Sequence, residues 1–523
     1  MAELLRERAA TDLSLPALTD DRGTATIGAL DARVNRWVHT LRASGLTAGD
    51  RLCVAAGNTN ETFEVALACV HAGVTLVPVN WHFTAAEMAH LVRDSGARGL
   101  VVDPERAAVA AGIEEFTTPP ALRLVLGERP HSGFRATEPL LAGALSEEPT
   151  DQVSGALMLY TSGTTGTPRG VINGVLTSGG PLSRVRETLP ALGNRLGLPE
   201  GGASLLAGPW YHSAQLFFSL FPLLRGAHLV MRHKFDPETT LRLIDSEGVN
   251  TTHMVPTQFV RLLRLPEETR AGFSGASLTR VWHGGGSCPV EVKRRMIEWW
   301  GPVLLEYYAA TEAGVVTLID SKTWLRKPGS VGRPLPRTDI LIVDDDGDPL
   351  PPGQPGRVFI RRSPKGDFSY YNDPEKTRQA HLGPGTFTYG DLGWLDADGY
   401  LFLSGRSADT IVSGGVNVYP AEVEEVLLDH PAVGDAAVLG VPDEEFGERV
   451  VAAVRLTPET PEGTDPAEAL DAFCRSRLAG FKVPRAYEVV DHLPRDEMGK
   501  LRRRELRPLF PSLSPAQRNG GIS

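Results

Sequence analysis

Small and hydroxyl-bearing residues are concentrated in one short segment, 161–168, and give it the composition of a phosphate-binding loop. The segment lies in ALMLYTSGTTGTPRGVIN, between two apolar runs that resemble strands. Glycines let backbone N–H groups approach an anion closely, and Ser and Thr hydroxyls supply further donors. The residues that could contact a phosphate are Thr161, Ser162, Gly163, Thr164, Thr165 and Gly166. Taken alone, the same tract also fits a solvated hairpin loop.

This loop is not of the Walker type. The sequence lacks GxxxxGK[ST] at this place, and Pro168 is followed by a strand-like run. A nucleotide-binding βα turn would instead continue into a helix, whose N-terminus binds the phosphates.

The sequence around the loop predicts an α/β domain. From Thr24 to about Val255, segments of helical period alternate with short β-branched runs such as 229–233 and 252–256. This alternation is typical of parallel strands joined by helices. The longest apolar stretch, 65–79, is too short to cross a bilayer, so we predict a buried helix that leads into a strand.

Two further regions differ in character. Residues 330–405 are rich in Gly, Pro and Asp, and contain short strands such as DILIVD, which indicates antiparallel β structure. From Ser407 onward, GGVNVYPAEVEEVLLDHP predicts a turn and a strand, and then an amphipathic helix that starts at Pro420. We therefore expect a small α+β domain at this end, with residues 511–523 as a frayed tail.

Composition restricts the class of function. A chain of 523 residues, 41% hydrophobic and 22% charged, is larger than one hydrophobic core supports, so at least two domains are expected. The formal net charge of −11 argues against a nucleic-acid or membrane-surface binder and favours small-molecule partners. The four cysteines are far apart and form no CxxC or Cys/His cluster, so neither disulfides nor zinc are indicated and a cytoplasmic location fits best. MAELLRERAA lacks the apolar run of a signal peptide, so none is expected.

The loop and the motifs after it resemble those of a known family. YTSGTTGTPRGV at 160–171 resembles YTSGTTGxPKGV of the AMP-forming adenylate superfamily, with Arg169 in place of the usual Lys. That superfamily includes acyl-CoA synthetases, adenylation domains of peptide synthetases and luciferases, and the pattern here is most similar to acyl-CoA synthetases. Further similar motifs follow in order, from GVTLVPVN at 73–80 to MGKLRRREL at 498–506. The resemblance implies that the loop at 161–168 binds the phosphates of ATP.

Two of these motifs imply contacts with the nucleotide and its metal. EYYAATEAG at 306–314 resembles YGxTE of the family. It implies that Tyr308 stacks on adenine, Thr311 meets the α-phosphate and Glu312 holds Mg²⁺, which prefers one or two carboxylates beside phosphate oxygens and water. Ala309 replaces the family's glycine. HGGGSCP at 283–289 resembles the GGAP-like segment that flanks adenine, and its binding candidates are Gly285, Gly286 and Ser287.

Another motif implies the position of the acid. PWYHSAQ at 209–215 resembles the segment that puts an aromatic residue or a histidine between the acyl pocket and the thiol channel, which gives this place to His212. Large rings nearby could favour a compact aromatic or medium-chain acyl group, although aromatic residues are also common in protein cores. The pocket residues implied are Trp210, His212, Phe217, Trp282 and Gly284.

The motif at 388–394 implies a ribose contact. TYGDLGW resembles TGD, whose Asp binds both ribose hydroxyls, so Asp391 is the candidate; Tyr389 replaces the usual Thr. In GRSADTIVSGGVNVYPAEVEE, at 405–425, the resemblance implies that Arg406 reaches the ribose or a phosphate.

The remaining motifs imply a moving domain. Asp409 corresponds to the hinge between domains, and Gly414 and Gly415 lie on the loop that enters the site during thioester formation. PRDEMGK at 494–500 resembles PxxxxGK, which makes Lys500 the catalytic lysine.

The resemblance also implies a fold and a reaction. The fold is α/β, with a large N-terminal domain (1–408) of two α/β layers and a small β subdomain, and a small mobile α+β C-terminal domain (409–523). A carboxylate attacks the α-phosphorus of ATP in the presence of Mg²⁺, and pyrophosphate leaves an acyl-adenylate. The thiol of coenzyme A then takes the acyl group and releases AMP. The residues expected to act in catalysis are Lys500, Glu312, Thr161 and His212.

Other functions stay open at this point. Some relatives deliver the acyl group to a carrier protein or an amine, or activate another oxyanion such as nitrite, and the three motif substitutions leave these alternatives open. A nucleotide-binding module without chemistry is disfavoured, because the metal, ribose and catalytic-lysine residues are all present. The identity of the acid and the presence of a homodimer are also open.

Overall fold

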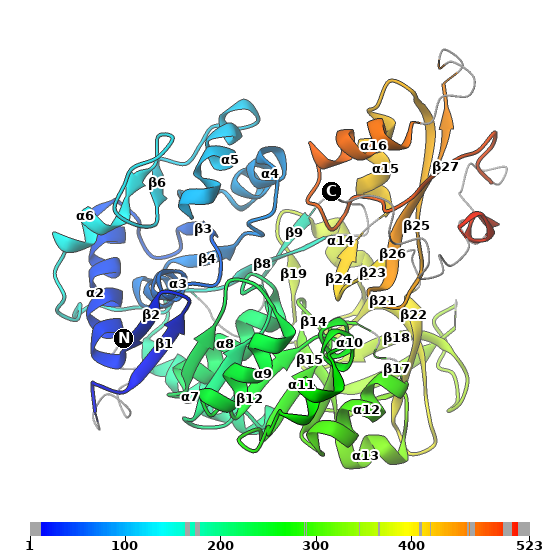
Figure 1. Cartoon of the computed structure of the whole chain (residues 1–523), viewed down its shortest axis with the longest axis horizontal. Helices are drawn as coiled ribbons and strands as arrows, with labels where there is room; N and C mark the ends of the chain where they lie inside the picture. Colours follow the sequence, from blue (N-terminus) through cyan, green and yellow to red (C-terminus); the bar gives the residue numbers. More distant parts are fainter. Residues whose placement is uncertain are drawn as a thin grey trace.

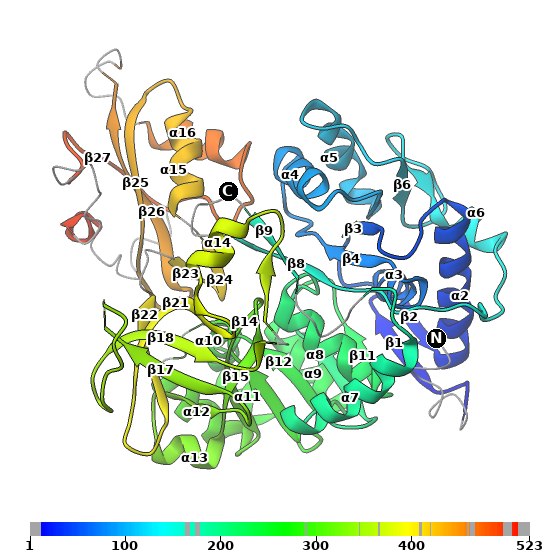
Figure 2. The same ribbon diagram turned by 180° about the vertical axis from the view of Figure 1, so that it is seen from behind.

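The protein is α/β, with a large N-terminal domain and a small C-terminal domain, and both are visible in Figures 1 and 2. The structure is a computed structural model. It describes residues 12–162, 168–172, 178–286, 288, 290–344, 346–364, 367–406, 411–418, 420–457, 460, 466–494 and 505–510. The elements of the C-terminal domain run from yellow through orange to red in Figure 1 and lie beside the large domain.

The first sheet of the large domain is parallel. It consists of β3 (Arg51–Ala55), β4 (Thr75–Pro78), β5 (Gly99–Val102), β6 (Leu122–Val125) and β7 (Arg135–Ala136), in the order β4-β3-β5-β6-β7. The helices of this region are α2 (Ile27–Ala43), α3 (Asn60–Ala72), α4 (Ala85–Ser95), α5 (Ala107–Ala111) and α6 (Thr137–Ala142), with 3₁₀ turns η1 (Pro104–Arg106) and η2 (Gly112–Glu115). Every residue of β4 and β5 is buried, as in sheets covered on both faces. The buried helix α3 leads into β4, which confirms the prediction for residues 65–79.

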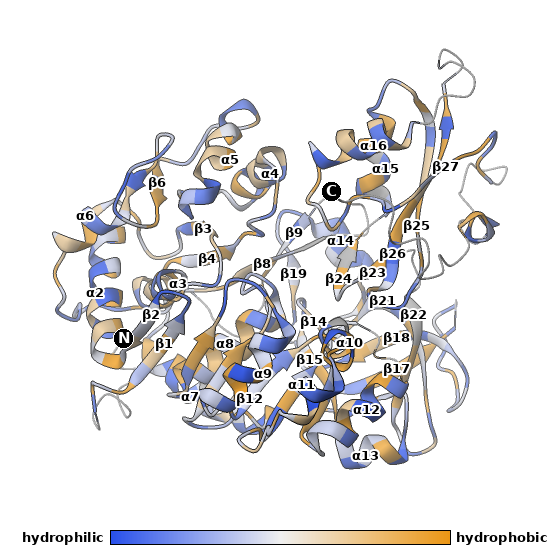
Figure 3. Cartoon of the chain, viewed as in Figure 1, coloured by the Kyte–Doolittle hydropathy of each residue, from blue (hydrophilic) through white to orange (hydrophobic). Residues whose placement is uncertain are grey.

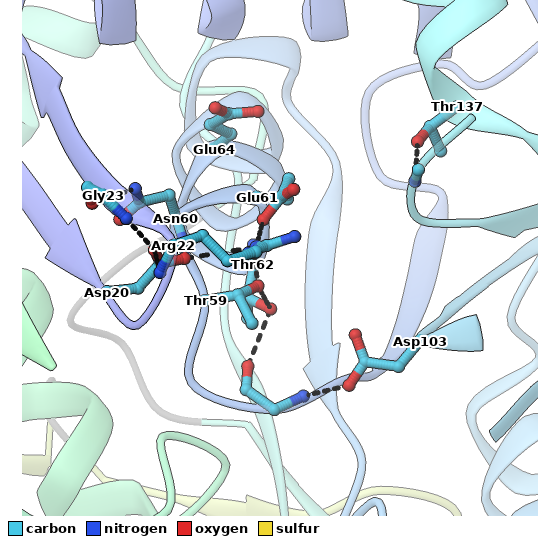
Figure 4. Close-up of polar contacts among 12 residues, drawn as sticks. Asp20, Arg22, Gly23, Thr59, Asn60, Glu61, Thr62, Glu64, Asp103 and Thr137 are labelled. Carbon is cyan, nitrogen blue, oxygen red and sulfur yellow. Dashed lines mark hydrogen bonds and ion pairs between the residues drawn. The ribbon is translucent and has the colours of Figure 1, made fainter. Parts of the chain in front are cut away.

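Helix α3 begins at a cap that also anchors the first strand pair, β1 (Pro16–Asp20) and β2 (Gly23–Thr26). The Thr59 side chain accepts a hydrogen bond from the backbone N–H of Thr62, which satisfies one free donor of the first turn. The Asp20 carboxylate accepts from the N–H of Asn60 at 2.9 Å. Figure 4 shows these contacts together with the ion pair between Arg22 and Glu61. Arg22 lies in the turn between β1 and β2, so these contacts connect the N-terminal strands to the start of α3.

The second sheet crosses the large domain and joins a parallel half to an antiparallel half. The parallel half contains β1 with β10 (Ala203–Leu206), β11 (His228–Met231), β12 (Thr251–Met254), β13 (Arg280–His283) and β14 (Leu304–Ala310). The antiparallel half contains β15 (Gly314–Asp320), β16 (Ser330–Pro334), β17 (Asp339–Val343), β18 (Gly356–Arg361), β20 (His381–Gly383), β21 (Thr386–Leu395) and β22 (Leu401–Arg406). The strand order is β17-β18-β21-β22-β16-β15-β14-β13-β12-β10-β11-β1-β2, with β20 on β21. The parallel strands predicted near 229 and 252 and the antiparallel region at 330–405 are confirmed.

Eight helices are described around this sheet. They are α7 (Leu182–Leu196), α8 (Ser213–Leu224), α9 (Pro237–Ser246), α10 (Pro256–Leu263), α11 (Glu267–Ala271), α12 (Val290–Trp300), α13 (Ser321–Arg326) and α14 (Pro374–Gln379). In Figure 3 the central strands are mostly apolar, whereas α9 and α12 carry many polar residues, as expected for helices with one solvent-facing side. No helix within the described ranges is long and apolar enough to cross a membrane.

A small third sheet carries the ends of the predicted phosphate loop. Its strands are β8 (Met158–Ser162), β9 (Pro168–Ile172) and β19 (Ser369–Tyr370), in the order β19-β9-β8. Strands β8 and β9 pair antiparallel, with Ser162 opposite Pro168. The strand predicted after Pro168 is therefore confirmed.

The C-terminal domain is α+β. It contains β23 (Ile411–Ser413), β24 (Val416–Val418), α15 (Pro420–Leu428), β25 (Val433–Asp443), β26 (Gly447–Leu456), α16 (Ala467–Arg475), β27 (Tyr487–Val489) and η5 (Arg507–Leu509). The strand order is β24-β23-β26-β25, with β27 on β26. Helix α15 begins at Pro420 as predicted. The proposed boundary between 408 and 409, like the tail at 511–523, falls outside the described residues, so both stay predictions.

Candidate active site

A cavity of about 2220 Å³ opens between the large domain and the C-terminal domain. Its wall combines residues of α7, α8 and the second sheet with C-terminal residues at 414–416, 443–448 and 480–482. The sequence-predicted residues that line it are His212, Phe217, Gly284, Gly285, Gly286, Tyr308, Ala309, Thr311, Glu312, Asp391, Gly414 and Gly415. Residues from motifs far apart in the sequence therefore meet around one space.

The predicted adenine and ribose residues touch each other. The Tyr308 hydroxyl, on β14, donates a hydrogen bond to Asp391 Oδ2, on β21, at 2.5 Å. Three strands, β15, β16 and β22, lie between these two in the sheet order, so the sheet must curl to bring the side chains together. Asp391 also stands opposite Arg406 in the β21–β22 ladder, although the Arg406 side chain lies outside the described part of the chain.

The turn between β14 and β15 carries the predicted metal and α-phosphate residues. Glu312 Oε1 accepts a hydrogen bond from the Tyr370 hydroxyl at 2.9 Å, and Thr311 Oγ1 donates to Ser213 Oγ, in the first turn of α8, at 3.0 Å. Lys376 Nζ lies 4.4 Å from the centre of the Tyr370 ring. Burial lowers the pKa of Lys376, and the nearby Glu312 carboxylate opposes that shift. An acidic group, a phenol and a cation are thus grouped where phosphates are expected.

Arg169, which stands for the family's lysine, is held in an ion pair. Its Nε lies 3.1 Å from Asp373 Oδ2, and Asp373 also caps α14 by accepting from the N–H of Lys376. This contact ties β9 to α14, so the substitution is accommodated by a local carboxylate. The predicted loop residues Gly163, Thr164, Thr165 and Gly166 lie outside the described ranges, as do the side chains of Thr161 and Ser162.

The other two motif substitutions also fit their surroundings. Ala309 lies next to a register shift between β14 and β15, where the ladder is already irregular. The Tyr389 ring packs edge-on to Tyr308, with ring centres 5.8 Å apart. Burial raises the pKa of Tyr389, so its phenol stays protonated. Tyr389 therefore adds a ring beside the residue expected to stack on adenine.

The acid side of the cavity begins at His212, the residue before α8. Burial lowers the pKa of His212 to about 4, and the neighbouring His82 adds to the shift. The imidazole is therefore neutral at pH 7. Beyond it, the rings of Phe217 and Phe221 stack with centres 4.3 Å apart.

Two predicted pocket residues are not in the pocket wall, and the structure corrects this prediction. Trp210 and Trp282 are fully buried, and neither is among the residues that line the cavity. The reason is that each indole N–H has a partner in the core: Trp210 donates to Ala56 O at 2.6 Å, and Trp282 to Leu196 O at 3.3 Å. The α8 rings that do line the cavity are Phe217, Phe218 and Phe221.

The glycine segment after β13 needs its small residues. A Cβ on Gly284 would lie 2.7 Å from the Tyr307 ring and 2.8 Å from the Tyr307 carbonyl oxygen, so a side chain does not fit. Gly285 has φ of +78°, which favours glycine. Gly286 faces the C-terminal domain, because a Cβ there would be 3.8 Å from the Gly415 Cα. Ser287 falls in a gap of the described chain.

The turn between β23 and β24 reaches the same place from the C-terminal domain. Gly414 and Gly415 form this turn with φ of +62° and +78°. A Cβ on Gly415 would lie 3.1 Å from Val255 Cβ, so the glycine permits close docking on the large domain. The roles assigned to Asp409 and Lys500 stay predictions, because both lie outside the described residues.

The acidic residues of the site suit a metal that also binds phosphate. Within the described ranges, no group of three or more His, Cys, Asp or Glu side chains could hold a metal ion. Glu312 offers one half-buried carboxylate at the cavity. This donor set fits Mg²⁺, which keeps water and nucleotide phosphates as most of its ligands.

The two-domain α/β fold, the loop between β8 and β9 and the contact of Tyr308 with Asp391 beside Glu312 define an adenylate-forming enzyme. The sequence matches the model for the AMP-binding enzyme over residues 5–365 and that for the AMP-binding enzyme C-terminal domain over 422–500. The chain belongs to the AMP-binding enzyme family, which confirms the predicted class, an AMP-forming ligase that uses ATP.

Relatives of known name match over nearly the whole chain. The protein is 34% identical to feruloyl-CoA synthase of Amycolatopsis sp. over 495 residues, 93% of this chain and 94% of that one. It is 32% identical to the fatty acid–[acyl-carrier-protein] ligase ScoC of Streptomyces coeruleorubidus over 506 residues, 95% of this chain and 93% of that one. The solved structure of amide bond synthetase McbA from Marinactinospora thermotolerans superposes with a TM-score of 0.84 at 29% identity, and covers 96% of this chain and 99% of that one.

Proposed function

We propose that this enzyme joins a small carboxylic acid to the thiol of coenzyme A through an acyl-adenylate. The observation that carries the proposal is the contact of Tyr308 with Asp391 in a cavity that Glu312 also lines. Two motifs far apart in the sequence supply these three residues, EYYAATEAG for Tyr308 and Glu312 and TYGDLGW for Asp391. An adenylate-forming site needs all three chemistries: a ring for the base, a carboxylate for the ribose and a carboxylate for the metal.

In the first step a carboxylate attacks the α-phosphorus and pyrophosphate leaves. Two anions approach each other, so the residues must mainly stabilise charge and fix geometry. We assign Lys500 to the carboxylate and α-phosphate oxygens. One ammonium at about 4 Å contributes roughly 4 kcal/mol at an effective dielectric of about 20, or about three decades in rate. Mg²⁺ held by Glu312 would neutralise part of the phosphate charge.

In the second step the thiolate of coenzyme A attacks the acyl carbonyl of the mixed anhydride. The C–S bond forms, the C–O bond to AMP breaks, and AMP carries away the electron pair. The thiol proton is lost to solvent before the attack. We assign His212 to the wall between acid and thiol, where a neutral imidazole with pKa of about 4 brings no charge near the thiolate. The small Gly414–Gly415 turn would leave room for the thiol arm.

For the acid we propose a compact aromatic or medium-chain group. The cavity wall on α8 carries Phe217, Phe218 and Phe221, whose rings offer flat apolar surface to such a group. Release of pyrophosphate with ATP and Mg²⁺ should depend on the acid and not on coenzyme A. A panel of aromatic, medium-chain and long-chain acids then identifies the substrate.

The acceptor is tested on the same acid. Release of AMP with formation of a thioester on addition of coenzyme A supports the proposal. An acyl-adenylate that coenzyme A leaves intact, but that an acyl carrier protein or an amine consumes, would establish one of the alternative acceptors instead.

The cellular location and the oligomeric state also belong to this proposal. The three buried cysteines Cys53, Cys69 and Cys474 are free in the structure, which suits the proposed cytoplasmic location. A homodimer is the one oligomer considered for this protein, and its presence stays open until it is measured. The location is tested by fluorescence microscopy of the tagged protein in cells. The oligomeric state is tested by light scattering on the purified protein.

A further inference from the structure

A buried lysine joins the two domains beside the cavity. Lys482, which follows α16, is 2% exposed. Its Nζ lies 2.9 Å from Glu87 Oε1, in the first turn of α4, and 2.5 Å from Glu422 Oε1, in the first turn of α15. Glu87 belongs to the large domain and Glu422 to the C-terminal domain, so one ammonium bridges them.

The surroundings fix this ion pair on both sides. Glu87 Oε2 accepts from the N–H of Thr84 at 2.9 Å in a capping box, which holds the carboxylate in place. The Thr84 hydroxyl also donates to the carbonyl oxygen of Arg477 at 3.2 Å, across the domain boundary. Lys482 Nζ stands 4.7 Å from the centre of the Phe83 ring. The start of α4 therefore makes several contacts with the C-terminal domain at once.

The two carboxylates keep the Lys482 side chain protonated. Burial alone would lower the pKa of Lys482, but the carboxylates of Glu422 and Glu87 outweigh burial and raise it, so the side chain is an ammonium. If the C-terminal domain turned away, Lys482 would keep Glu422 and lose Glu87. The buried hydrogen bond between the Lys482 ammonium and the Glu87 carboxylate would then be replaced by separate hydrogen bonds of the two groups with water.

The same orientation of the C-terminal domain brings its glycine turn to the cavity. Gly415 rests against Val255 and Gly286 there. Glu445 also forms ion pairs across the boundary, with Arg261 at 3.2 Å and with Arg264 at 3.6 Å, but this group is partly exposed and contributes less. The buried Lys482 contact is thus the stronger of these two ionic restraints on the orientation.

We propose that Glu87 and Lys482 are positioning residues for the thioester-forming step, because their contact holds the Gly414–Gly415 turn at the cavity. This inference rests on the proposed two-step function. Neither residue contacts a residue assigned to the nucleotide, so the contact should be needed for the second step and not for the first.

The test uses Glu87→Gln in the full-length enzyme. Glutamine keeps the side-chain length and an acceptor for the α4 cap, but it removes the charge that Lys482 binds. We expect thioester formation from supplied acyl-adenylate and coenzyme A to fall about 10-fold, as for loss of a hydrogen bond between charged groups. Acid-dependent pyrophosphate release without coenzyme A should stay within about twofold. Lys482→Met should reduce the same step, and the double variant should lose less than the product of the two single losses.

The matched control is Glu138→Gln, which breaks an ion pair with Arg33 inside the large domain. It should leave both half-reactions unchanged. Equal loss of both half-reactions in Glu87→Gln, or an unchanged thioester rate, would overturn the inference.

A measurement without catalysis separates this inference from the proposed function. Hydrogen exchange of the amides in α4 and in residues 477–482 should become faster in Glu87→Gln and not in Glu138→Gln. If the wild-type enzyme activates no acid, the proposed function fails while exchange still reports on the domain contact. Unchanged exchange at both segments would overturn the inference whatever the activity.

Discussion

Replacing Asp391 by alanine should weaken ATP binding by about two decades. The carboxylate is 5% exposed, and one oxygen already accepts a hydrogen bond from Tyr308 at 2.5 Å. A carboxylate has about four acceptor positions, so it can also accept both ribose hydroxyls. Each hydrogen bond to a charged group contributes about 1.5–3 kcal/mol. Two bonds at the lower end amount to about 3 kcal/mol, which is roughly two decades in the KM for ATP.

The assay is acid-dependent pyrophosphate release against ATP concentration. The nucleotide 2′,3′-dideoxy-ATP lacks both hydroxyls, so wild-type enzyme and Asp391→Ala should use it with similar KM. Tyr308→Phe is the control, because it keeps the ring and the carboxylate and should change the KM less than about 10-fold. If Asp391→Ala still prefers ATP over the dideoxy nucleotide as strongly as the wild type does, Asp391 does not bind the ribose.

Three other predictions test separate parts of the molecule. Lys500→Ala should reduce pyrophosphate release by roughly two to three decades, while supplied acyl-adenylate still forms thioester; equal losses would refute the assignment. Lys293→Met leaves Glu306 without the ammonium 2.5 Å away in a buried place. The free energy of unfolding in urea should fall by about 3–5 kcal/mol, and adding Glu306→Leu should restore most of it. Burial lowers the pKa of His71 and His253 to about 3, whereas both take up a proton near pH 6.5 when unfolded. The unfolded chain therefore binds more protons than the folded chain below pH 6.5. As the pH falls from 6.5 toward 3, each histidine should lower the free energy of unfolding by up to about 1.4 kcal/mol per pH unit, which denaturant titrations at several pH values measure. A rise in the free energy of unfolding on acidification would contradict this account.

Local pattern was enough to predict several individual elements of the fold. The apolar run at 65–79 became α3 and β4, and Pro420 began α15, because helix starts and buried strands depend on residues close in sequence. The sequence did not predict the curl that brings β14 to β21. That arrangement depends on strand pairings between distant segments, which no single motif encodes.

The candidate site was predicted by motif and corrected by packing. Tyr308 and Asp391 come from separate motifs, and their contact was not expected from either one. Trp210 and Trp282 were misassigned because a large ring gives the same sequence signal in a pocket wall and in a core. Tyr370 and Lys376 were missed because neither lies in a recognised motif. The signal that could have found them is the helix start at Asp373–Pro374, since Asp373 caps α14 and the preceding strand β19 pairs with β9, which follows the phosphate loop.

The curl that joins Tyr308 to Asp391 has a consequence for the stability of the enzyme. A nucleotide that binds both residues spans the parallel and antiparallel halves of one sheet, so it can bind only after both halves have folded. Such a ligand stabilises the native state by mass action, by about 2.7 kcal/mol at 100 times its Kd. Without ATP the same chain loses this stabilisation, so a larger fraction of it is unfolded at a given temperature.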